Sequence, residues 1–445
     1  RESPIPQWRR VVSVVILTLL SLFMMFDRYV TAGILPRLES YYSISNTWGG
    51  LLQTGYIVVY VVCLLVVGAI GDRMSRKRII LVSTLFWIVF MIASSFIPSN
   101  MFWLFITIRS LTSIGLAAVN ALAPSLFADY FTGAARGSSL MIFYMSLPVG
   151  SSSSIAFGSS LVQSDYFLWA LRLCPIIAIL LLFLSIFLLE EPIRGGLEEA
   201  SQANTTSVKH DLFSIFRVKS FWLAVMPTLL FNFYLGAFSW WSATLIGSAI
   251  NSTNNDPAIY HGVEFGSWMG ISSACVCVAS ILGSMIFVNF SEMWRDGKFC
   301  FTKSQRAPAL TVGFLLLIDK EMISAIVSDL LMKSLYCHSQ ALTSLGTLLS
   351  AGIMPLDTEI VLMVITSTRR AAALSIMNIL MCITGDGPAP FIVGLITDLF
   401  LGGSTDSADL FNALRKTLLI CQAISTTSFV FALANAIVLP SEIIR

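Results

Sequence analysis

Charge is scarce in this sequence. Of its 445 residues only 12% are Asp, Glu, Lys or Arg, whereas soluble domains carry about 25%. Hydrophobic residues make up 56% of the chain, and its mean hydropathy is +0.81. Because so few polar side chains cannot cover a water-soluble globule, the composition excludes a soluble enzyme and a nucleic-acid-binding protein. It indicates a protein that crosses a membrane many times.

Residues that hold metals and cofactors are scarce as well. The chain has three histidines, His210, His261 and His338, and none of its eight cysteines forms a CxxC pair. This set gives little material for a zinc or haem site, and the cysteines are interpreted as buried structural thiols. The sequence also lacks a nucleotide-binding loop and a nucleophile motif. We therefore expect no metal, no cofactor and no enzymatic activity.

Long apolar runs, in contrast, are abundant. Each is close to the length of about 20 residues that crosses a bilayer as a helix, and each is bounded by charges or by Gly and Pro. Twelve such spans lie near residues 11–35, 49–70, 79–97, 102–126, 138–162, 167–189, 221–248, 264–290, 309–335, 340–365, 371–396 and 415–439. The chain is thus expected to span the membrane repeatedly.

The spans fall into two sets of six, separated by one long polar stretch. Six spans, a polar bridge and six more spans are the layout of a two-half transporter. We therefore predict an all-α membrane protein with twelve transmembrane helices in two six-helix bundles. The bundles cover residues 1–189 and 221–445. The cytosolic linker over 190–220 contains an amphipathic helix that lies on the membrane surface.

The basic residues predict the orientation. Most of the 27 Lys and Arg residues lie in the loops that face the cytosol if the N-terminus is cytosolic, so we expect both termini in the cytosol. The ninth span is the least regular, because Asp319, Lys320 and Glu321 interrupt its apolar run. Charges that face lipid are costly, so three alternatives stand: these side chains face a cavity, they mark a broken helix, or the sequence of this stretch is aberrant.

A segment rich in glycine and charge joins the second and third spans. Small residues let helices approach closely, and an acid followed by cations can form a polar latch at the cytosolic rim. A plain basic loop is the alternative. The candidate gate residues are Gly68, Gly71, Asp72, Arg73, Arg76 and Lys77. The order GAIGDRMSRKR resembles the loop signature of the major facilitator superfamily, and Arg109, followed by Gly115, resembles its second signature.

A narrower resemblance begins at residues 27–35. Their sequence DRYVTAGIL is similar to the first-span motif of the Spinster family of lipid transporters, and Glu191-Pro192 and Gly385-Asp386 continue the likeness. The resemblance covers nearly all of the first half but only about residues 340–400 of the second. It implies a major facilitator fold whose two halves rock around a central cavity. It also implies an amphiphilic cargo, such as a lysophospholipid or a sphingoid phosphate.

The chain departs from the Spinster pattern at two titratable positions. The fourth span of the family typically carries a membrane Glu, where this chain has Leu116, and the eleventh typically carries a His, where it has Cys382. The resemblance would assign both groups to proton coupling. Their loss puts proton coupling in doubt and leaves facilitated uniport as an alternative.

Five residues are the main candidates for binding cargo and protons. The adjacent charges of Asp27 and Arg28 allow an ion pair inside the membrane, which can change protonation when a partner moves or a phosphate competes for the arginine. A fixed pair that stabilises packing is the alternative. Arg28 or Arg172 can bind a head group, and Tyr56 and Tyr60, on one face of the second span, can line an acyl chain or pack between helices.

Further candidates are polar residues within other spans. They are Arg109, Tyr144, Asp357, Glu359 and Asp386. Asp357 and Glu359 are two residues apart and point in different directions on a helix, so only one of them can face a given cavity. Asp386 lies among Gly and Pro residues, where we expect a kink or a helix cap.

These observations favour a secondary transporter of an amphiphilic lipid that works by alternating access. Alternatives are a uniporter of the same cargo, a carrier of small organic solutes, and a membrane sensor that transports nothing. The expected partners are a lipid substrate, the bilayer and, if transport is coupled, protons; no nucleic acid is expected, and we predict a monomer. The Spinster resemblance implies a lysosomal or endosomal membrane or the plasma membrane.

Overall fold

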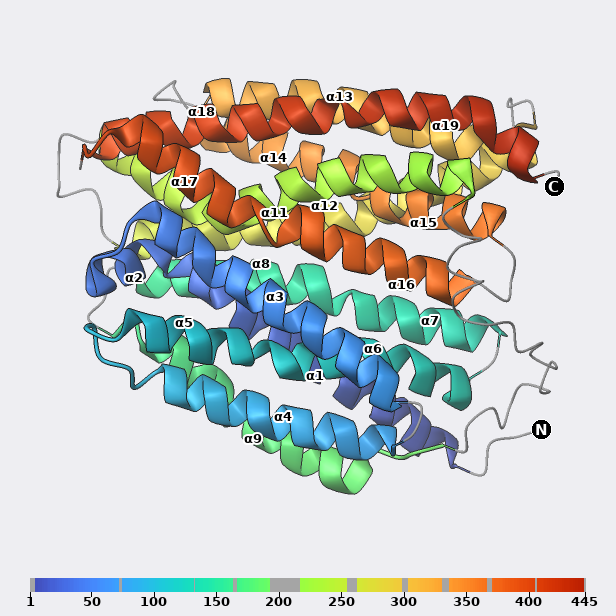
Figure 1. Ribbon diagram of the computed structural model, residues 1–445, viewed down its shortest axis with the longest axis horizontal. Helices are drawn as coiled ribbons and strands as arrows, with labels where there is room; N and C mark the ends of the chain where they lie inside the picture. Colours follow the sequence, from blue (N-terminus) through green and yellow to red (C-terminus); the bar gives the residue numbers. More distant parts are fainter. Residues whose placement is uncertain are drawn as a thin grey trace. The chain divides into compact units, whose positions relative to one another are not determined.

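The computed structural model describes residues 5–71, 74–131, 133–162, 166–192, 217–253, 262–297, 303–329, 336–365, 370–404 and 406–443. Within these ranges all regular structure is helical (Figure 1). The first set of helices is α1 (Gln7–Gly33), α2 (Leu35–Tyr42), α3 (Asn46–Gly71), α4 (Arg76–Ser94), α5 (Phe102–Leu111), α6 (Ser113–Tyr130), α7 (Gly133–Tyr144), α8 (Ser146–Leu161) and α9 (Trp169–Leu188). The second set is α11 (Lys219–Thr253), α12 (Gly262–Asp296), α13 (Ala307–Asp329), α14 (Tyr336–Ser350), α15 (Ile353–Val364), α16 (Arg370–Leu380), the π-helical segment η2 (Met381–Asp386), α17 (Ala389–Leu401), α18 (Ser407–Thr426) and α19 (Ser428–Ile443).

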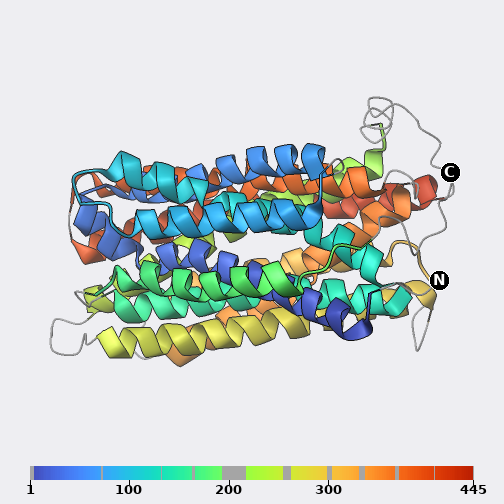
Figure 2. The same cartoon turned by 90° about the horizontal axis from the view of Figure 1, so that it is seen from below.

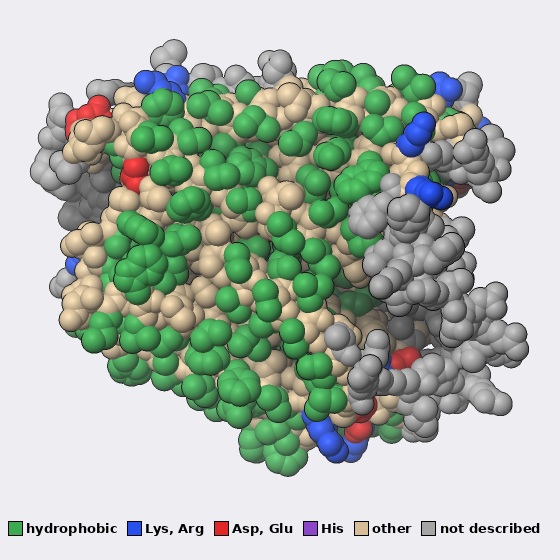
Figure 3. Space-filling model, viewed as in Figure 1, with side chains coloured by type: hydrophobic (Ala, Val, Ile, Leu, Met, Phe, Trp, Pro, Cys, Tyr) green, Lys and Arg blue, Asp and Glu red, His purple; other side chains and the backbone are tan. Residues whose placement is uncertain are grey.

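The helices match the twelve predicted spans. Ten helical stretches of the described chain are long and apolar enough to cross a membrane. The ninth and tenth predicted spans correspond to α13 and to α14 with α15. On the face shown in Figure 3, hydrophobic side chains cover the middle of the helices, and the charged side chains in view lie near helix ends. An apolar surface of this kind belongs in lipid.

The contacts between helices divide the chain into two compact units. Unit 1 contains α1 to α9 and the start of α12 up to Ser273, and unit 2 contains α11 and the rest of the chain from Ala274. Residues 193–216, which hold most of the predicted linker and its amphipathic helix, lie outside the described residues. The bundle and linker boundaries therefore stay predictions.

Several spans consist of two helices that meet at a bend. The α5–α6 and α18–α19 spans bend at Thr112 and Thr427, where the threonine hydroxyl donates to a carbonyl three residues earlier, that of Arg109 at 2.6 Å and that of Ile424 at 2.7 Å. Hydroxyl groups that bond back to the preceding turn bend helices. In α13, by contrast, the backbone stays helical through Asp319, so the predicted alternative of a broken helix at that point is wrong.

Glycine sets the close packing of α1 against α8 in unit 1 (Figure 2). A Cβ atom at Gly158 would lie 2.9 Å from the carbonyl oxygen of Val30 and 3.0 Å from the Cα atom of Gly33. One at Gly150 would lie 2.7 Å from the carbonyl oxygen of Leu22. Small residues of this kind allow transmembrane backbones to approach one another. The contact fixes the half of α1 that carries the charged residues of the first span.

In unit 2, α11 is the central helix and packs against α15, η2, α18 and α19. The backbone of η2 is π-helical, which supports the predicted irregularity near Asp386. Asn232 of α11 donates its side-chain amide to the carbonyl oxygen of Met381 at 3.4 Å. Gly236 lets α11 approach η2 closely, since a Cβ atom at Gly236 would lie 2.8 Å from the Cα atom of Asp386.

Candidate functional site

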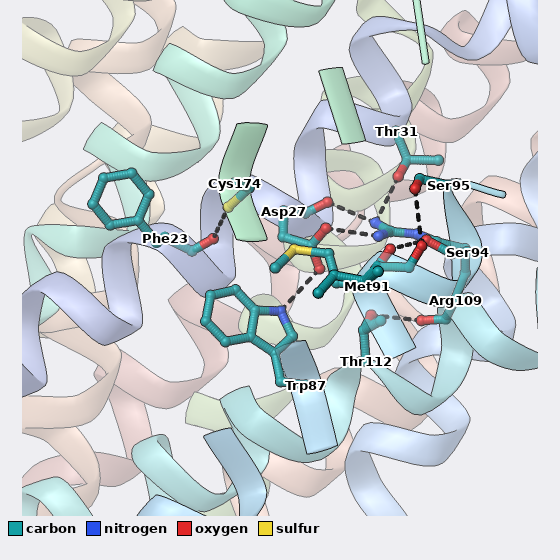
Figure 4. A network of polar contacts seen from close by, with 11 residues as sticks. Phe23, Asp27, Thr31, Trp87, Met91, Ser94, Ser95, Arg109, Thr112 and Cys174 are labelled. Carbon is teal, nitrogen blue, oxygen red and sulfur yellow. Dashed lines mark hydrogen bonds and ion pairs between the residues drawn. The ribbon is translucent and has the colours of Figure 1, made fainter. Parts of the chain in front are cut away.

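A buried ion pair lies inside unit 1 (Figure 4). Arg109 Nη1 donates to Asp27 Oδ1 at 2.6 Å, and Arg109 Nη2 donates to the backbone carbonyl of Asp27 at 2.7 Å and to Thr31 Oγ1 at 2.8 Å. Trp87 Nε1 donates to the second carboxylate oxygen of Asp27 at 3.1 Å. Asp27 and Arg109 are only 1% and 3% exposed. Each charge is thus balanced and hydrogen-bonded away from water, as buried charges require.

Three helices build this pair. α1 supplies Asp27 and Thr31 one turn apart on the same face, α4 supplies Trp87, and Arg109 lies in the last turn of α5 just before the bend at Thr112. The pairing corrects one expectation, because Asp27 pairs with Arg109 and not with its neighbour Arg28. Adjacent residues of a helix point in different directions, so the two charges cannot meet face to face.

Arg28 contacts α3 instead. Its Nε donates to Oε1 of Gln53 at 3.5 Å, and its guanidinium carbon lies 4.8 Å from the ring centre of Tyr29 and 5.5 Å from that of Tyr56. Arg28 and Tyr56 are 7% and 4% exposed. Tyr60, one turn further along α3, accepts a hydrogen bond from Asn120 at 3.2 Å. The structure thus brings Arg28 and Tyr56 together, as sequence reasoning grouped them.

Arg172 lies apart from this group in its contacts. Its Nη2 donates to the carbonyl of Ser95 at 3.1 Å, and its guanidinium lies 4.9 Å from the ring centre of Phe96 and 5.7 Å from that of Trp169. No hydrogen bond or ion pair joins Arg172 to Asp27. Phe96 and Trp169 are both exposed, so Arg172 sits beside aromatic rings on the surface of unit 1.

A second polar network lies at the start of α4, beside the predicted gate. Arg76 is buried, forms an ion pair with Asp129 at the end of α6, and donates to Ser125 at 3.2 Å. The backbone N–H of Arg76 donates to Glu191 at 2.8 Å, and Ser75 donates its hydroxyl to the same carboxylate. A carboxylate at a helix N-terminus satisfies free N–H groups and stabilises the helix dipole.

The residue before Glu191 joins the same network to α1. Glu190 pairs with Arg9, and its carbonyl accepts a hydrogen bond from the Tyr130 hydroxyl. Arg10 donates to the carbonyl of Tyr130 at 3.0 Å. Burial raises the pKa of Tyr130 to about 12, so this hydroxyl stays protonated and remains a donor at neutral pH. The segment after α9 is therefore held against α1, α4 and α6.

The remaining gate candidates differ in their surroundings. A Cβ atom at Gly71 would lie 2.8 Å from the side chain of Leu122, which fits a close helix approach. Within the described chain, a Cβ atom at Gly68 would have no heavy atom within 4 Å, so close packing does not explain that glycine. Lys77 is half-buried, and Asp72 and Arg73 lie outside the described residues.

In unit 2 the two acids of α15 have different partners, as their spacing predicted. Asp357 accepts a hydrogen bond from Thr228 of α11 at 2.6 Å, whereas Glu359 forms an ion pair with Arg295 of α12. Asp386 lies at the end of η2 against α11. Tyr144 is 60% exposed at the end of α7 and packs edge-on against the neighbouring Phe143 ring.

Comparison with known proteins agrees with this architecture. The family profile of the Major Facilitator Superfamily matches residues 17–387. Protein spinster homolog 1 of Homo sapiens is 31% identical over 98% of this chain and 81% of its own length. This chain belongs to the Spinster family of the major facilitator superfamily. The sequence resemblance at residues 27–35 is thereby confirmed.

Two further comparisons extend the likeness. The sphingosine-1-phosphate transporter SPNS2 of Xenopus tropicalis is 27% identical over 97% of this chain and 82% of its own. The structure of a bacterial homolog to the human lysosomal transporter Spinster, in an inward-facing and unoccupied conformation, superposes with a TM-score of 0.78 at 16% identity, covering 98% of both chains. This Spinster-family chain therefore has the twelve-helix major facilitator fold and is a transporter rather than an enzyme.

The two residues that depart from the Spinster pattern, Leu116 and Cys382, lie in α6 and η2. Leu116 is buried in α6, one residue after Gly115, which lies close to the Trp87 side chain. Cys382 lies in η2. Sequence reasoning missed the contributions of Trp87 and Glu191 to the two networks. No sequence signal marks Trp87. A search for helix caps examines residues next to the helix, so it would not have found Glu191, which lies 115 residues after the start of α4 that it caps.

Proposed function

We propose that this Spinster-family protein is a secondary transporter of an amphiphilic lipid, such as a lysophospholipid or a sphingoid phosphate, and that it works by alternating access. One observation carries the proposal: a buried Asp27–Arg109 pair next to Arg28, in a chain whose relatives include a sphingosine-1-phosphate transporter. Arg109 is fully engaged by Asp27 and Thr31. We assign head-group binding to Arg28, whose guanidinium suits a phosphate.

Asp27 is proposed as the proton-coupling group. Its carboxylate is held by Arg109 and Trp87, and a change in either contact alters the balance between its charged and neutral forms. Uniport remains the alternative, because Leu116 and Cys382 carry no ionisable carboxyl or imidazole. Tyr56 and Tyr60 are proposed to form part of the wall for the acyl chain.

The segment between α3 and α4 is proposed as the cytosolic gate. Its support is the network of Arg76 with Asp129 and Glu191, which ties the start of α4 to α6 and to the chain after α9. We further propose cytosolic termini, a monomer, and a lysosomal, endosomal or plasma membrane as the site of action. Orientation rests on the distribution of Lys and Arg residues.

The cargo is tested by uptake into proteoliposomes. The purified protein is offered labelled lysophospholipid, sphingoid phosphate, a hexose and a small organic anion in parallel. We expect uptake of the two lipids only, loss of that uptake in Arg28→Gln, and retention in Arg37→Gln, since Arg37 is exposed on α2. Uptake of hexose or anion would instead identify a carrier of small solutes, and binding of lipid without uptake would identify a sensor.

A further inference from the structure

Asp357 is a buried acid that forms no ion pair with any side chain that the structure describes. It lies on α15, is 1% exposed, and accepts one hydrogen bond, from Thr228 Oγ1 to its Oδ2 at 2.6 Å. The acids Asp27 and Glu359, in contrast, are each paired with an arginine. A negative charge buried without a counter-ion is costly, and a bound proton removes that charge.

Buried apolar residues lie next to both partners in their own helices. Leu229 follows Thr228 in α11 and Leu356 precedes Asp357 in α15, and these two leucines belong to two buried apolar clusters to which α11, α13 and α15 contribute. Ile360, one turn after Asp357, is 1% exposed. The carboxyl group is therefore flanked in its own helix by buried apolar residues and receives its hydrogen bond from a neutral hydroxyl.

The described ionisable groups of the helices that contact α15 do not pair with Asp357. α11, α12, α13, α16 and α19 have residues in contact with α15. Among their described side chains, α11 contributes Lys219 in its first turn and Tyr234. α12 contributes Glu292, Arg295 and Asp296 near Glu359, and the thiols of Cys275 and Cys277. The described side chains of α13, α16 and α19 include no ionisable group. Of these groups, none forms an ion pair with Asp357.

The hydroxyl of Thr228 accommodates both states of the carboxyl. Its oxygen lies 2.6 Å from Asp357 Oδ2 and 3.2 Å from the carbonyl oxygen of Ala224, but a hydroxyl has a single proton to donate. With Asp357 charged, the proton points to the carboxylate. With Asp357 neutral, the carboxyl donates to Thr228 Oγ1, and the hydroxyl turns to Ala224. Every donor has an acceptor in both arrangements.

We propose that Asp357 and Thr228 form a second proton-binding site, in unit 2, which takes up and releases a proton during transport. The inference rests on the proposed transport function. The site supplies a titratable group to the unit in which Cys382 stands at the position of the family's typical histidine. Asp27 would then be the proton-binding acid of unit 1, and Asp357 that of unit 2.

Infrared difference spectroscopy of the purified protein during a pH titration tests proton binding directly. The wild type is expected to show carbonyl bands of protonated carboxyl groups, and Asp357→Asn should lose the band that Asp357 contributes while that of Asp27 remains. Glu359→Gln should keep this band, which would show that its loss is specific to Asp357 and does not follow from removing the other acid of α15. An unchanged band in Asp357→Asn would overturn the proposal.

Lysophospholipid uptake into proteoliposomes tests the link to transport. Asp357→Asn is nearly isosteric and is expected to lose accumulation driven by a pH gradient while it retains counterflow, which needs no net proton movement. Asp409→Asn, an exposed acid at the start of α18, serves as the control and should retain both. Gradient-driven accumulation that survives in Asp357→Asn would contradict the proposal.

Thr228 provides a second variant pair. Thr228→Val removes the hydroxyl and should shift the pH dependence of gradient-driven uptake, whereas Thr228→Ser should restore it. Identical pH profiles for Thr228→Val and Thr228→Ser would overturn the proposed role of the Thr228 hydroxyl. Wild-type lipid uptake that ignores the gradient would overturn proton uptake by Asp357 and leave lipid transport standing, whereas no lipid uptake at all would contradict the proposed function itself.

Discussion

Among single residues, the described part of the chain contains two buried acids with different partners. Asp27 is held by Arg109 and Trp87, whereas the described partner of Asp357 is a threonine hydroxyl. In a membrane interior such residues are functional candidates by default, because a lone charge there is expensive. Asp27 and Asp357 thus lie in different environments, and we propose that both of them bind protons.

The buried pair makes a prediction about stability. Arg109→Gln and Asp27→Asn should each lower the free energy of unfolding by about 3–5 kcal/mol, because each leaves one charge buried without its partner. The double variant should lose much less than the sum, since no lone charge remains. Thermal unfolding of the purified protein in detergent measures all four forms. Losses that simply add would show that the two side chains are not coupled.

Sequence alone indicated the charged members of this site but not their pairing. Asp27 is the only acid within the first six predicted spans, so an arginine of those spans could form an ion pair within them with this carboxylate alone. Arg28, Arg109 and Arg172 were all available, and the choice of Arg109, 82 residues away, depends on how α1 packs against α5. Packing across that separation is a tertiary property that hydropathy does not encode.

At the scale of elements, the length of the apolar runs predicted the helices well. The predicted spans agree with the observed helices because a membrane helix needs only a run of apolar residues of sufficient length. The bends at Thr112 and Thr427 were not predicted, since a hydroxyl that bonds back to its own helix leaves no mark in hydropathy. Such bends matter here because the first one follows Arg109 by a single turn.

The α1–α8 contact gives a test at this scale. Gly158→Ala would place a methyl group 2.9 Å from a backbone carbonyl of α1, and we expect a loss of about 1–3 kcal/mol in the free energy of unfolding. Gly68→Ala is the control, because a Cβ atom there meets no described atom within 4 Å. Thermal unfolding midpoints compare the two. Equal midpoints would show that the close approach is not needed for stability.

At the scale of the whole molecule, the orientation in the membrane is the first property to establish. Ser404 lies exposed between α17 and α18, and Met74 lies exposed just before α4. With cytosolic termini, and in cells that express the protein at the plasma membrane, a membrane-impermeant thiol reagent should label Ser404→Cys in intact cells and label Met74→Cys only after permeabilisation. The wild type provides the background from its own thiols. The reverse pattern of labelling would contradict the predicted orientation.

The central claim is lipid transport in which Asp27 carries a proton. It is tested most directly by uptake of labelled lysophospholipid into proteoliposomes, with and without a pH gradient, for the wild type, Asp27→Asn and the control Asp409→Asn. We expect uptake that follows the gradient in the wild type and the control, and that is lost in Asp27→Asn at matched amounts of folded protein. Gradient-driven uptake that persists in Asp27→Asn, or lipid uptake that is absent from the wild type, would contradict it.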